Sequence, residues 1–220
     1  MFVFNMVAHF KIIKNKHLKL KIPSNTMVMG SSGSGKTMYV LKLIKFVNHI
    51  FRPRPKNIVY AYGHDNDALP KLKKMGVITH KGLPSDKYLA NIKKPMILIL
   101  DDLMLQANKD YLDNLFTVKS HHENIAVIKM VQNAFHKNLK TLRDNCHYFF
   151  LFNSPAAKRQ IRDFGVNVFP QKYKNFLKIF ENVVKSKYEP LFIDLQPNTD
   201  EDLRLRSKIL PNQITEVYKP

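Results

Sequence analysis

A glycine-rich segment between an apolar run and an amphipathic helix constrains the fold of this chain more than any other feature. Residues 30–37 read GSSGSGKT and fit the pattern G-x-x-x-x-G-K-[ST]. Glycines let the backbone turn tightly and point its N–H groups at phosphate oxygens, and the following helix adds the positive end of its dipole. The segment therefore predicts a phosphate-binding loop that joins a strand to a helix.

Each part of this loop has a predicted role. Lys36 is the cation expected to reach the β- and γ-phosphates, and Thr37 offers a hydroxyl to Mg²⁺. The predicted cofactors are ATP and Mg²⁺. The expected nucleotide contacts are Gly30, Ser31, Ser32, Gly33, Ser34, Gly35, Lys36, Thr37 and Met38.

Near-continuous apolar runs predict the rest of the sheet. They occupy residues 26–30, 57–63, 95–104, 124–133 and 147–153, with helical patterns between several of them. Apolar strands that alternate with helices indicate a parallel sheet buried on both faces. The predicted fold class is α/β, a P-loop NTPase of RecA- or ASCE-like type with a mainly parallel central sheet flanked by helices. Ligands of such sheets bind at the carboxyl ends of the strands.

Polar residues follow two of these runs. Asp101 comes directly after ILIL and fits a metal-side carboxylate, acting on Mg²⁺ through water. Asp102 occupies the position of a general base, although glutamate is commoner there, and the alternative is that both aspartates cap the next helix. Gln132 ends the run 124–133 and is expected to touch the γ-phosphate and the attacking water. The alternative for Gln132 is an ordinary turn.

The charge of the chain indicates a polyanionic partner. The formal net charge is +19, and residues 1–100 hold 18 Lys and Arg against 3 Asp and Glu. Residues 16–22, KHLKLKI, alternate lysine with leucine or isoleucine and predict a strand with one cationic face. The alternative is a solvated, lysine-rich surface with no partner.

Other residues exclude some classes of protein. A single cysteine, Cys146, allows no internal disulfide and argues against a thiolate zinc site. No apolar run is long enough to span a membrane, and the start does not resemble a signal peptide, so we expect no membrane partner. His121 and His122 are expected to pack or to contact another subunit rather than to bind metal.

Several motifs together extend this interpretation. In order along the chain they read GSSGSGKT, IVYAYG, GLPSD, ILILDDLM, SHHENIAVIKMVQNAFH, LRDNCHYFFLFNSP and LFIDLQPNTDEDLRLRSKILP. Over about residues 20–212, the chain resembles the genome-packaging ATPases of the FtsK–HerA superfamily. The likeness is greatest to those of Polinton (Maverick) elements and related eukaryotic DNA viruses, with the poxvirus packaging ATPase more distant.

The resemblance implies a ring-shaped motor that drives double-stranded DNA into a preformed capsid. The implied partners are the DNA backbone, further copies of the chain and the capsid vertex, and the implied location is the infected host cell, in cytoplasm or nucleus, and the virion. Residues 1–195 would form the ATPase domain. Residues 196–220 would form a C-terminal extension packed on that domain or on a neighbouring subunit.

By the same resemblance, Lys36 and Thr37 are the loop pair, Asp101 and Asp102 the carboxylate pair, and Gln132 the polar sensor. The family also uses an arginine from a neighbouring subunit, and Arg143 lies where the family motif has one. We expect Arg143 at the carboxyl edge of the sheet. The alternatives are Arg159, Arg162, Arg204 and Arg206. Residues 154–160, SPAAKRQ, depart from the family pattern because an expected arginine is missing there.

Three other functions remain open at this point. A nucleotide kinase with a P-loop would need an arginine-rich lid, which the sequence does not show. A helicase-like or DNA-mobilising ATPase would belong to the same superfamily. A DNA-binding protein that uses the nucleotide only as a switch would not need Asp101, Asp102 and Gln132 together.

Overall fold

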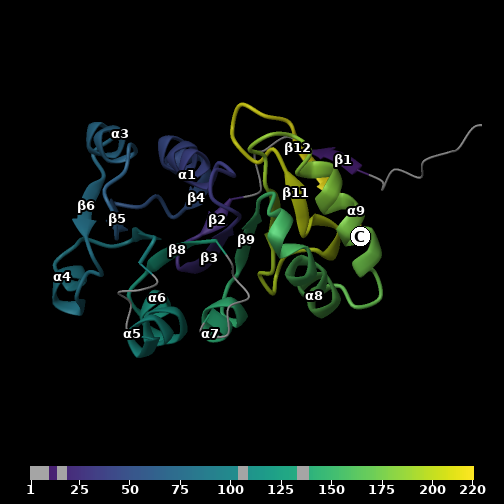
Figure 1. Ribbon diagram of the computed structural model, residues 1–220. Coiled ribbons are helices and arrows are strands. Elements are labelled where there is room, and N and C mark those ends of the chain that lie inside the picture. Colours follow the sequence, from purple (N-terminus) through teal and green to yellow (C-terminus); the bar gives the residue numbers. More distant parts are fainter. Residues whose placement is uncertain (1–9, 14–18, 104–108, 133–138) are drawn as a thin grey trace, which may run out of the picture.

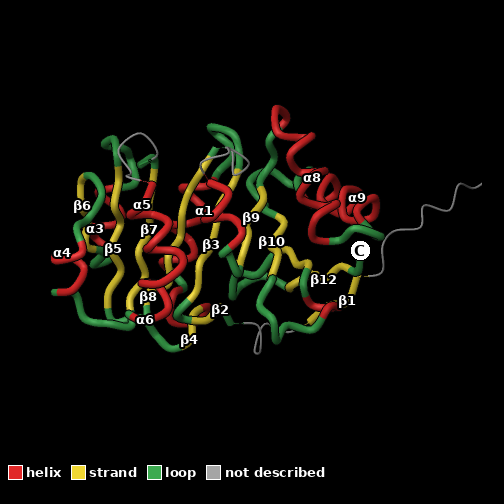
Figure 2. The backbone as a smooth tube through the Cα atoms, turned by 90° about the horizontal axis from the view of Figure 1, so that it is seen from below, coloured by secondary structure: helices red, strands yellow, loops and turns green. Residues whose placement is uncertain are grey.

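The computed structural model describes residues 10–13, 19–103, 109–132 and 139–220 of the 220-residue chain. Ten of the described strands form one sheet (Figures 1 and 2). Their order across it is β1 (Phe10–Ile13), β12 (Thr215–Tyr218), β11 (Leu205–Ser207), β10 (Leu191–Asp194), β9 (Tyr148–Leu151), β3 (Ser24–Met29), β8 (Ile125–Val131), β7 (Met96–Asp101), β5 (Asn57–Tyr62) and β6 (Ile78–Lys81).

The half of the sheet from β9 to β6 is parallel, so the prediction of an α/β fold with a mainly parallel sheet is confirmed. The strand β3 pairs with β8 on one side and with β9 on the other. The strand β8 also pairs with β7 and therefore separates β7 from β3. The carboxyl ends of β3, β7 and β8 consequently lie at one edge of the sheet.

The other half is antiparallel, which the sequence did not predict. Here β10 runs antiparallel to β9, and β11, β12 and β1 continue with alternating directions. A buried ion pair holds this half together: Arg206 on β11 donates to Asp194 on β10, and its guanidinium lies 4.7 Å from the centre of the Phe192 ring. The proposed boundary at residue 196 falls between β10 and β11, which are adjacent strands of this sheet.

Helices cover both faces of the sheet (Figure 1). One face carries α1 (Lys36–Lys45), α2 (Val47–Ile50) and α3 (Leu69–Lys74). The other carries α4 (Asp86–Ala90), α5 (Lys109–Asn114), the π-helical turn η2 (Leu115–Lys119), α6 (Ser120–His122), α7 (Lys140–Asp144), α8 (Lys158–Val168) and α9 (Tyr173–Val183). Successive residues of a strand point to opposite faces, so Val127 packs under the second set and Ile128 under the first.

The remaining elements are short. The strands β2 (Leu20–Lys21) and β4 (Phe51–Arg52) form a separate parallel pair, and 3₁₀ turns occur at η4 (Pro155–Ala157) and η5 (Glu201–Leu203). The strand expected over 16–22 is seen only over Leu20–Lys21, and residues 16–18 lie outside the described residues. No described helix combines the length and the hydropathy needed to cross a membrane.

Candidate nucleotide-binding site

The glycine-rich loop joins β3 to α1 at the carboxyl edge of the sheet, as predicted. The backbone N–H of Gly30 donates to the carbonyl of Val131, which ties the loop to β8. A Cβ on Gly30 would lie 2.6 Å from the Cβ of Phe152, so a larger residue would displace the loop. Gly35 precedes α1 with φ of 98°, a conformation that side chains rarely tolerate.

Lys36 turns back into this loop. Its Nζ donates to the carbonyls of Gly30 at 2.7 Å and Ser31 at 2.9 Å. Burial lowers the pKa of Lys36, while the nearby carboxylates of Asp101 and Asp102 oppose that shift. The ammonium is thus held inside the loop, where an incoming phosphate could exchange with the two carbonyls.

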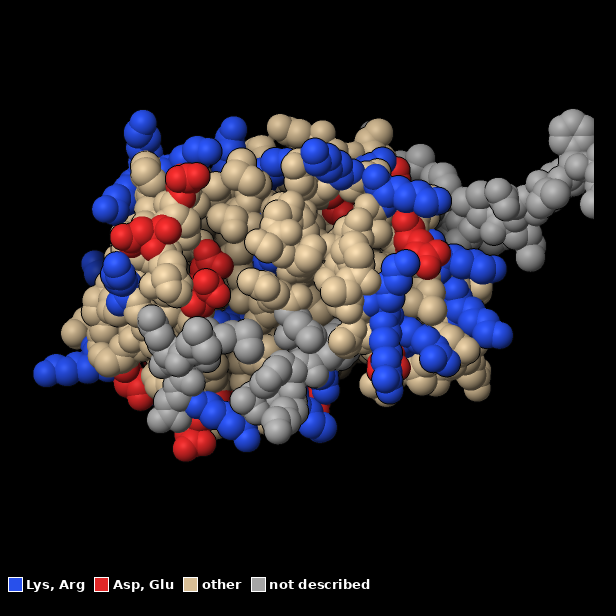
Figure 3. Space-filling model, in the orientation of Figure 1, with Lys and Arg blue, Asp and Glu red and all other residues tan. Residues whose placement is uncertain are grey.

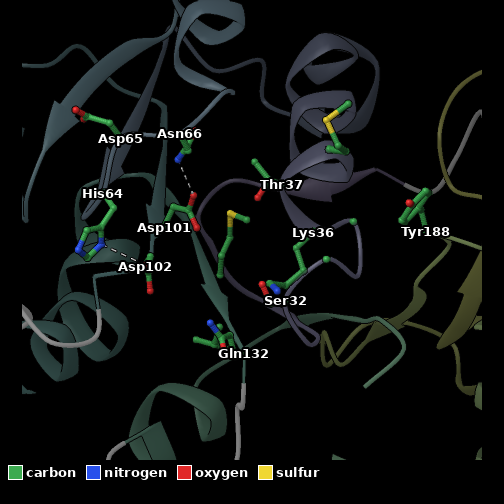
Figure 4. Close-up of a pocket in the computed structure, with 15 residues that line it drawn as sticks. Ser32, Lys36, Thr37, His64, Asp65, Asn66, Asp101, Asp102, Gln132 and Tyr188 are labelled. Atoms are coloured by element: carbon green, nitrogen blue, oxygen red, sulfur yellow. Dashed lines mark hydrogen bonds and ion pairs between the residues drawn. The ribbon is translucent and has the colours of Figure 1, made fainter. Parts of the chain in front are cut away.

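A pocket of about 770 Å³ opens beside the loop (Figure 4). This volume lies within the range of small-molecule sites. Of the predicted nucleotide contacts, Ser32, Gly33, Gly35, Lys36, Thr37 and Met38 line the pocket. Gly30, Ser31 and Ser34 belong to the loop but are not among its lining residues. Asp101, Asp102 and Gln132 line it too, so the structure brings these predicted residues together.

Asp101 lies at the end of β7 and is held by neighbours that the sequence interpretation missed. The Tyr60 hydroxyl of β5 donates a short hydrogen bond to its Oδ2, and the Nδ2 of Asn66 lies 3.5 Å from the same oxygen. Burial raises the pKa of Asp101, while the Tyr60 bond opposes the rise. In the sequence, Tyr60 appeared only as part of an apolar run. Its side-chain contact with Asp101 depends on the pairing of β5 with β7, in which the backbone partner of Asp101 is Tyr62.

Asp102 differs from Asp101 in being exposed at the pocket. Its backbone is in the left-handed region with φ of 49°, and its Oδ2 lies 3.4 Å from the Nδ1 of His64. A Cβ on Gly63 would lie 2.3 Å from the Asp102 carbonyl, so the two segments are in close backbone contact. The Asp102 side chain thus faces His64 at the pocket (Figure 4).

The strand β8 carries a second buried charge next to the site. Lys129 is 0% exposed, and its Nζ has no hydrogen-bond partner. Burial lowers the pKa of Lys129 to about 8, against the opposing effect of Asp101 and Asp102. Gln132 follows β8 and reaches the pocket, whereas Asn133 lies outside the described residues.

The position expected for Arg143 is wrong. Arg143 lies in α7, just before β9 begins, and a residue that precedes a parallel strand lies at the amino edge of the sheet. Its Nε is 3.5 Å from Asp144 Oδ1. Arg206 is buried against Asp194, and Arg204 pairs with Glu201. By contrast, Arg159 and Arg162 are exposed on α8, which follows the carboxyl end of β9.

Histidine and cysteine residues form no metal site in the described part of the chain. The His121 ring packs against His147 with ring centres 5.3 Å apart. Cys146 is buried, and burial raises its pKa well above the usual range of a thiol. The oxygen atoms of Thr37 and Asp101 are the kind of ligand that Mg²⁺ prefers, so these two residues are the candidates for holding it.

Comparisons with known proteins find no matching family model and no matching curated protein. Among solved structures, EssC (ATPases 2 and 3) from Geobacillus thermodenitrificans is 14% identical, with a TM-score of 0.45, over 89% of this chain and 39% of that chain. The protein PH0250 from Pyrococcus horikoshii OT3 is 15% identical, with a TM-score of 0.38, over 60% of this chain and 82% of the other.

A third similar structure is an ATPase from the type III secretion system of pathogenic bacteria, 13% identical, with a TM-score of 0.38, over 76% of this chain and 61% of that chain. This chain thus spans 39% of the EssC chain. Because every one of these TM-scores is below 0.5, the likenesses assign no activity to the chain. The function is therefore argued from the site.

The contact between Tyr60 and Asp101 yields a first prediction. In Tyr60→Phe the carboxylate loses the donor that fixes its orientation, so Mg²⁺-dependent binding of ATP should weaken by about 10-fold or more. Calorimetric titrations of ATP at several Mg²⁺ concentrations measure this. The control is Tyr62→Phe, because the Tyr62 ring lies beside that of Tyr60 on the same strand. An equal loss in both variants would contradict a specific role for the Tyr60 hydroxyl.

Proposed function

We propose that the chain binds ATP with Mg²⁺ and hydrolyses it. The observation that carries this proposal is the convergence of Lys36, Thr37, Asp101 and Asp102 on one pocket. A phosphate loop by itself serves many reactions, but a carboxylate at the end of a second strand adds the group needed to activate water. The strand β8 separates the two strands that carry these groups and brings Gln132 to the same pocket.

The residues have separate tasks in this reaction. Lys36 and the loop N–H groups hold the phosphates, and Thr37 with Asp101 would hold the metal ion. When bound, Mg²⁺ supplies positive charge to the phosphate oxygens. Asp102 accepts a proton from the attacking water, and its exposure in the pocket supports this role. Gln132 orients that water.

A second prediction separates binding from hydrolysis. Lys36→Ala removes the phosphate cation and should weaken ATP binding. Asp102→Asn keeps the size of the side chain but removes the base, so binding should persist while turnover falls by about 10²–10⁴-fold. Calorimetry measures the first property and phosphate release the second. Normal turnover by Asp102→Asn would show that another group takes the proton.

We further propose that ATP hydrolysis drives the translocation of double-stranded DNA, as in the packaging ATPases that the sequence resembles. The net charge of +19 supports a polyanionic partner. Lys and Arg lie along the upper rim of the molecule over α1 and α3 and also over α8 and α9, whereas Asp and Glu form smaller, separate groups on the same face (Figure 3). Assays of ATP hydrolysis with and without DNA, with the oligomeric state measured in the same samples, test this proposal.

A third prediction concerns DNA binding. Binding should not depend on base sequence and should fall steeply with salt, because phosphate contacts release counterions. Replacing Lys19 and Lys21 by Glu should weaken DNA binding but spare ATP binding, since β2 lies beside the start of β3, away from the pocket. The matched control replaces Lys174 and Lys178 by Glu, which are exposed on α9 and change the net charge equally. Equal losses in the two double variants would mean that only the total charge matters.

We also propose that an exposed arginine of a neighbouring copy completes the site. Arg159 and Arg162 suit this role better than Arg143, since they are exposed on α8 and form no ion pair with a described residue. The first turn of α8 contains basic residues and no acidic one, which is unfavourable for the helix dipole. The phosphate of a nucleotide bound to another subunit would supply the negative charge that the start of α8 lacks.

The fourth prediction tests this arginine. Arg159→Ala combined with Arg162→Ala should bind ATP normally but hydrolyse it about 10³–10⁵-fold more slowly. Mixing this variant with Lys36→Ala should restore part of the activity, because each chain supplies what the other lacks. Arg143→Ala serves as the control and should hydrolyse ATP normally. If no activity returns although mixed oligomers demonstrably form, the two arginines do not act between subunits.

A further inference from the structure

The pocket has two chemically different ends. Asp101 and Asp102 lie on one side of Lys36 and Thr37, and Tyr188 lies on the opposite side (Figure 4). The first end suits a metal ion and terminal phosphates. The second end presents an aromatic ring, and the proposed ATPase activity leaves that ring without a role.

Tyr188 belongs to a turn that the sheet topology brings to the pocket. This turn precedes β10, and Leu191 at the start of β10 pairs with Leu151 at the end of β9, so the turn lies at the carboxyl edge. The N–H of Glu189 donates to the carbonyl of Ser186, which closes the turn. The Glu189 carboxylate accepts the backbone N–H of Lys208 at 2.8 Å, which anchors the turn to the segment that follows β11.

The conformation of Tyr188 is unusual for its size. Its φ is 66°, in the left-handed region that bulky side chains rarely adopt, yet the residue remains 50% exposed. Burial of the side chain therefore does not offset the unfavourable backbone conformation. The ring packs instead on the phosphate loop: a Cβ on Gly35 would lie 2.7 Å from its Cδ1. The position of the ring is thus coupled to the loop.

Two exposed apolar side chains line this pocket. Among the described residues, the large apolar side chains that are well exposed are Met38, Met75, Val118, Val166, Tyr188 and Ile214. Met38, at 51% exposure, and Tyr188 line the pocket, whereas the other four do not. Met38 lies in the first turn of α1, next to the two residues assigned to phosphate and metal. A thioether and an aromatic ring are both side chains that suit contact with a flat aromatic group.

We propose that Tyr188 and Met38 hold the base of the bound nucleotide, with the base stacked on the Tyr188 ring. This inference rests on the proposed nucleotide site and deepens it. A nucleotide whose terminal phosphates lie toward Asp101 extends its base past Lys36 in the direction of Tyr188. The Nζ of Lys187 lies 5.0 Å from the centre of the Tyr188 ring, but a cation–π contact at an exposed site is weak and yields to stacking.

The test compares ATP with inorganic triphosphate, which has the phosphates but no base. Both are titrated with Mg²⁺ into the full chain, its Tyr188→Ala and Tyr188→Phe variants, and Lys36→Ala. Tyr188→Ala should weaken ATP binding by about 10-fold or more, in line with base stacking on aromatic side chains, and leave triphosphate binding unchanged. Tyr188→Phe keeps the ring and should bind ATP normally. Lys36→Ala should weaken both ligands.

Each other outcome overturns a specific statement. If Tyr188→Ala binds ATP as tightly as the unmodified chain, the base does not stack on this ring. If it loses ATP and triphosphate equally, Tyr188 acts only by supporting the loop through Gly35. If the unmodified chain binds neither ligand, the proposed nucleotide site fails and the base contact fails with it. If Tyr188→Phe loses ATP binding as Tyr188→Ala does, the hydroxyl and not the ring makes the contact.

Discussion

The parallel pairing of β3 with β8 and β9 is the constraint on which the site depends. In a parallel sheet all strands end at the same edge, so the groups that follow β3, β7 and β8 converge although they are far apart in the sequence. The glycine-rich loop leaves the sheet at the carboxyl edge because its strand lies between two neighbours that fix its direction. The N–H of Gly30 continues the β3–β8 ladder by one more hydrogen bond, which sets where the loop leaves the sheet.

Burial sets the electrostatics of this edge. Burial removes Lys36, Lys129 and Asp101 partly or fully from water. It lowers the pKa of the two lysines and raises the pKa of Asp101, which favours the uncharged form of each side chain. Opposite charges nearby oppose each of these shifts. Asp102 stays exposed beside them, which leaves its carboxylate accessible to a water molecule. The site thus combines an ordered, desolvated carboxylate with an accessible one, although the two are adjacent in the sequence.

The sequence predicted those parts of the fold that follow from local pattern. Apolar runs with polar ends predicted the parallel strands and placed Asp101 and Gln132 at their carboxyl ends. The antiparallel half was missed because its strands are three or four residues long, too short to show a clear period. Lys129 was read as part of an apolar run, and Tyr188 had no signal because its approach to Gly35 is set by tertiary contacts. The edge expected for Arg143 was wrong for a simpler reason, since a residue before a parallel strand lies at the amino edge.

The antiparallel half has a direct consequence for the site. A connection from helix to strand in the parallel half enters its strand at the amino edge, away from the pocket. Since β10 reverses direction, the connection from α9 enters it at the carboxyl edge and brings Tyr188 to the loop. The carboxylates come from β7 on one side of β3, and the aromatic ring comes from beside β10 on the other. Strand order therefore separates the two ends of the pocket, and strand direction decides that both ends line the same pocket.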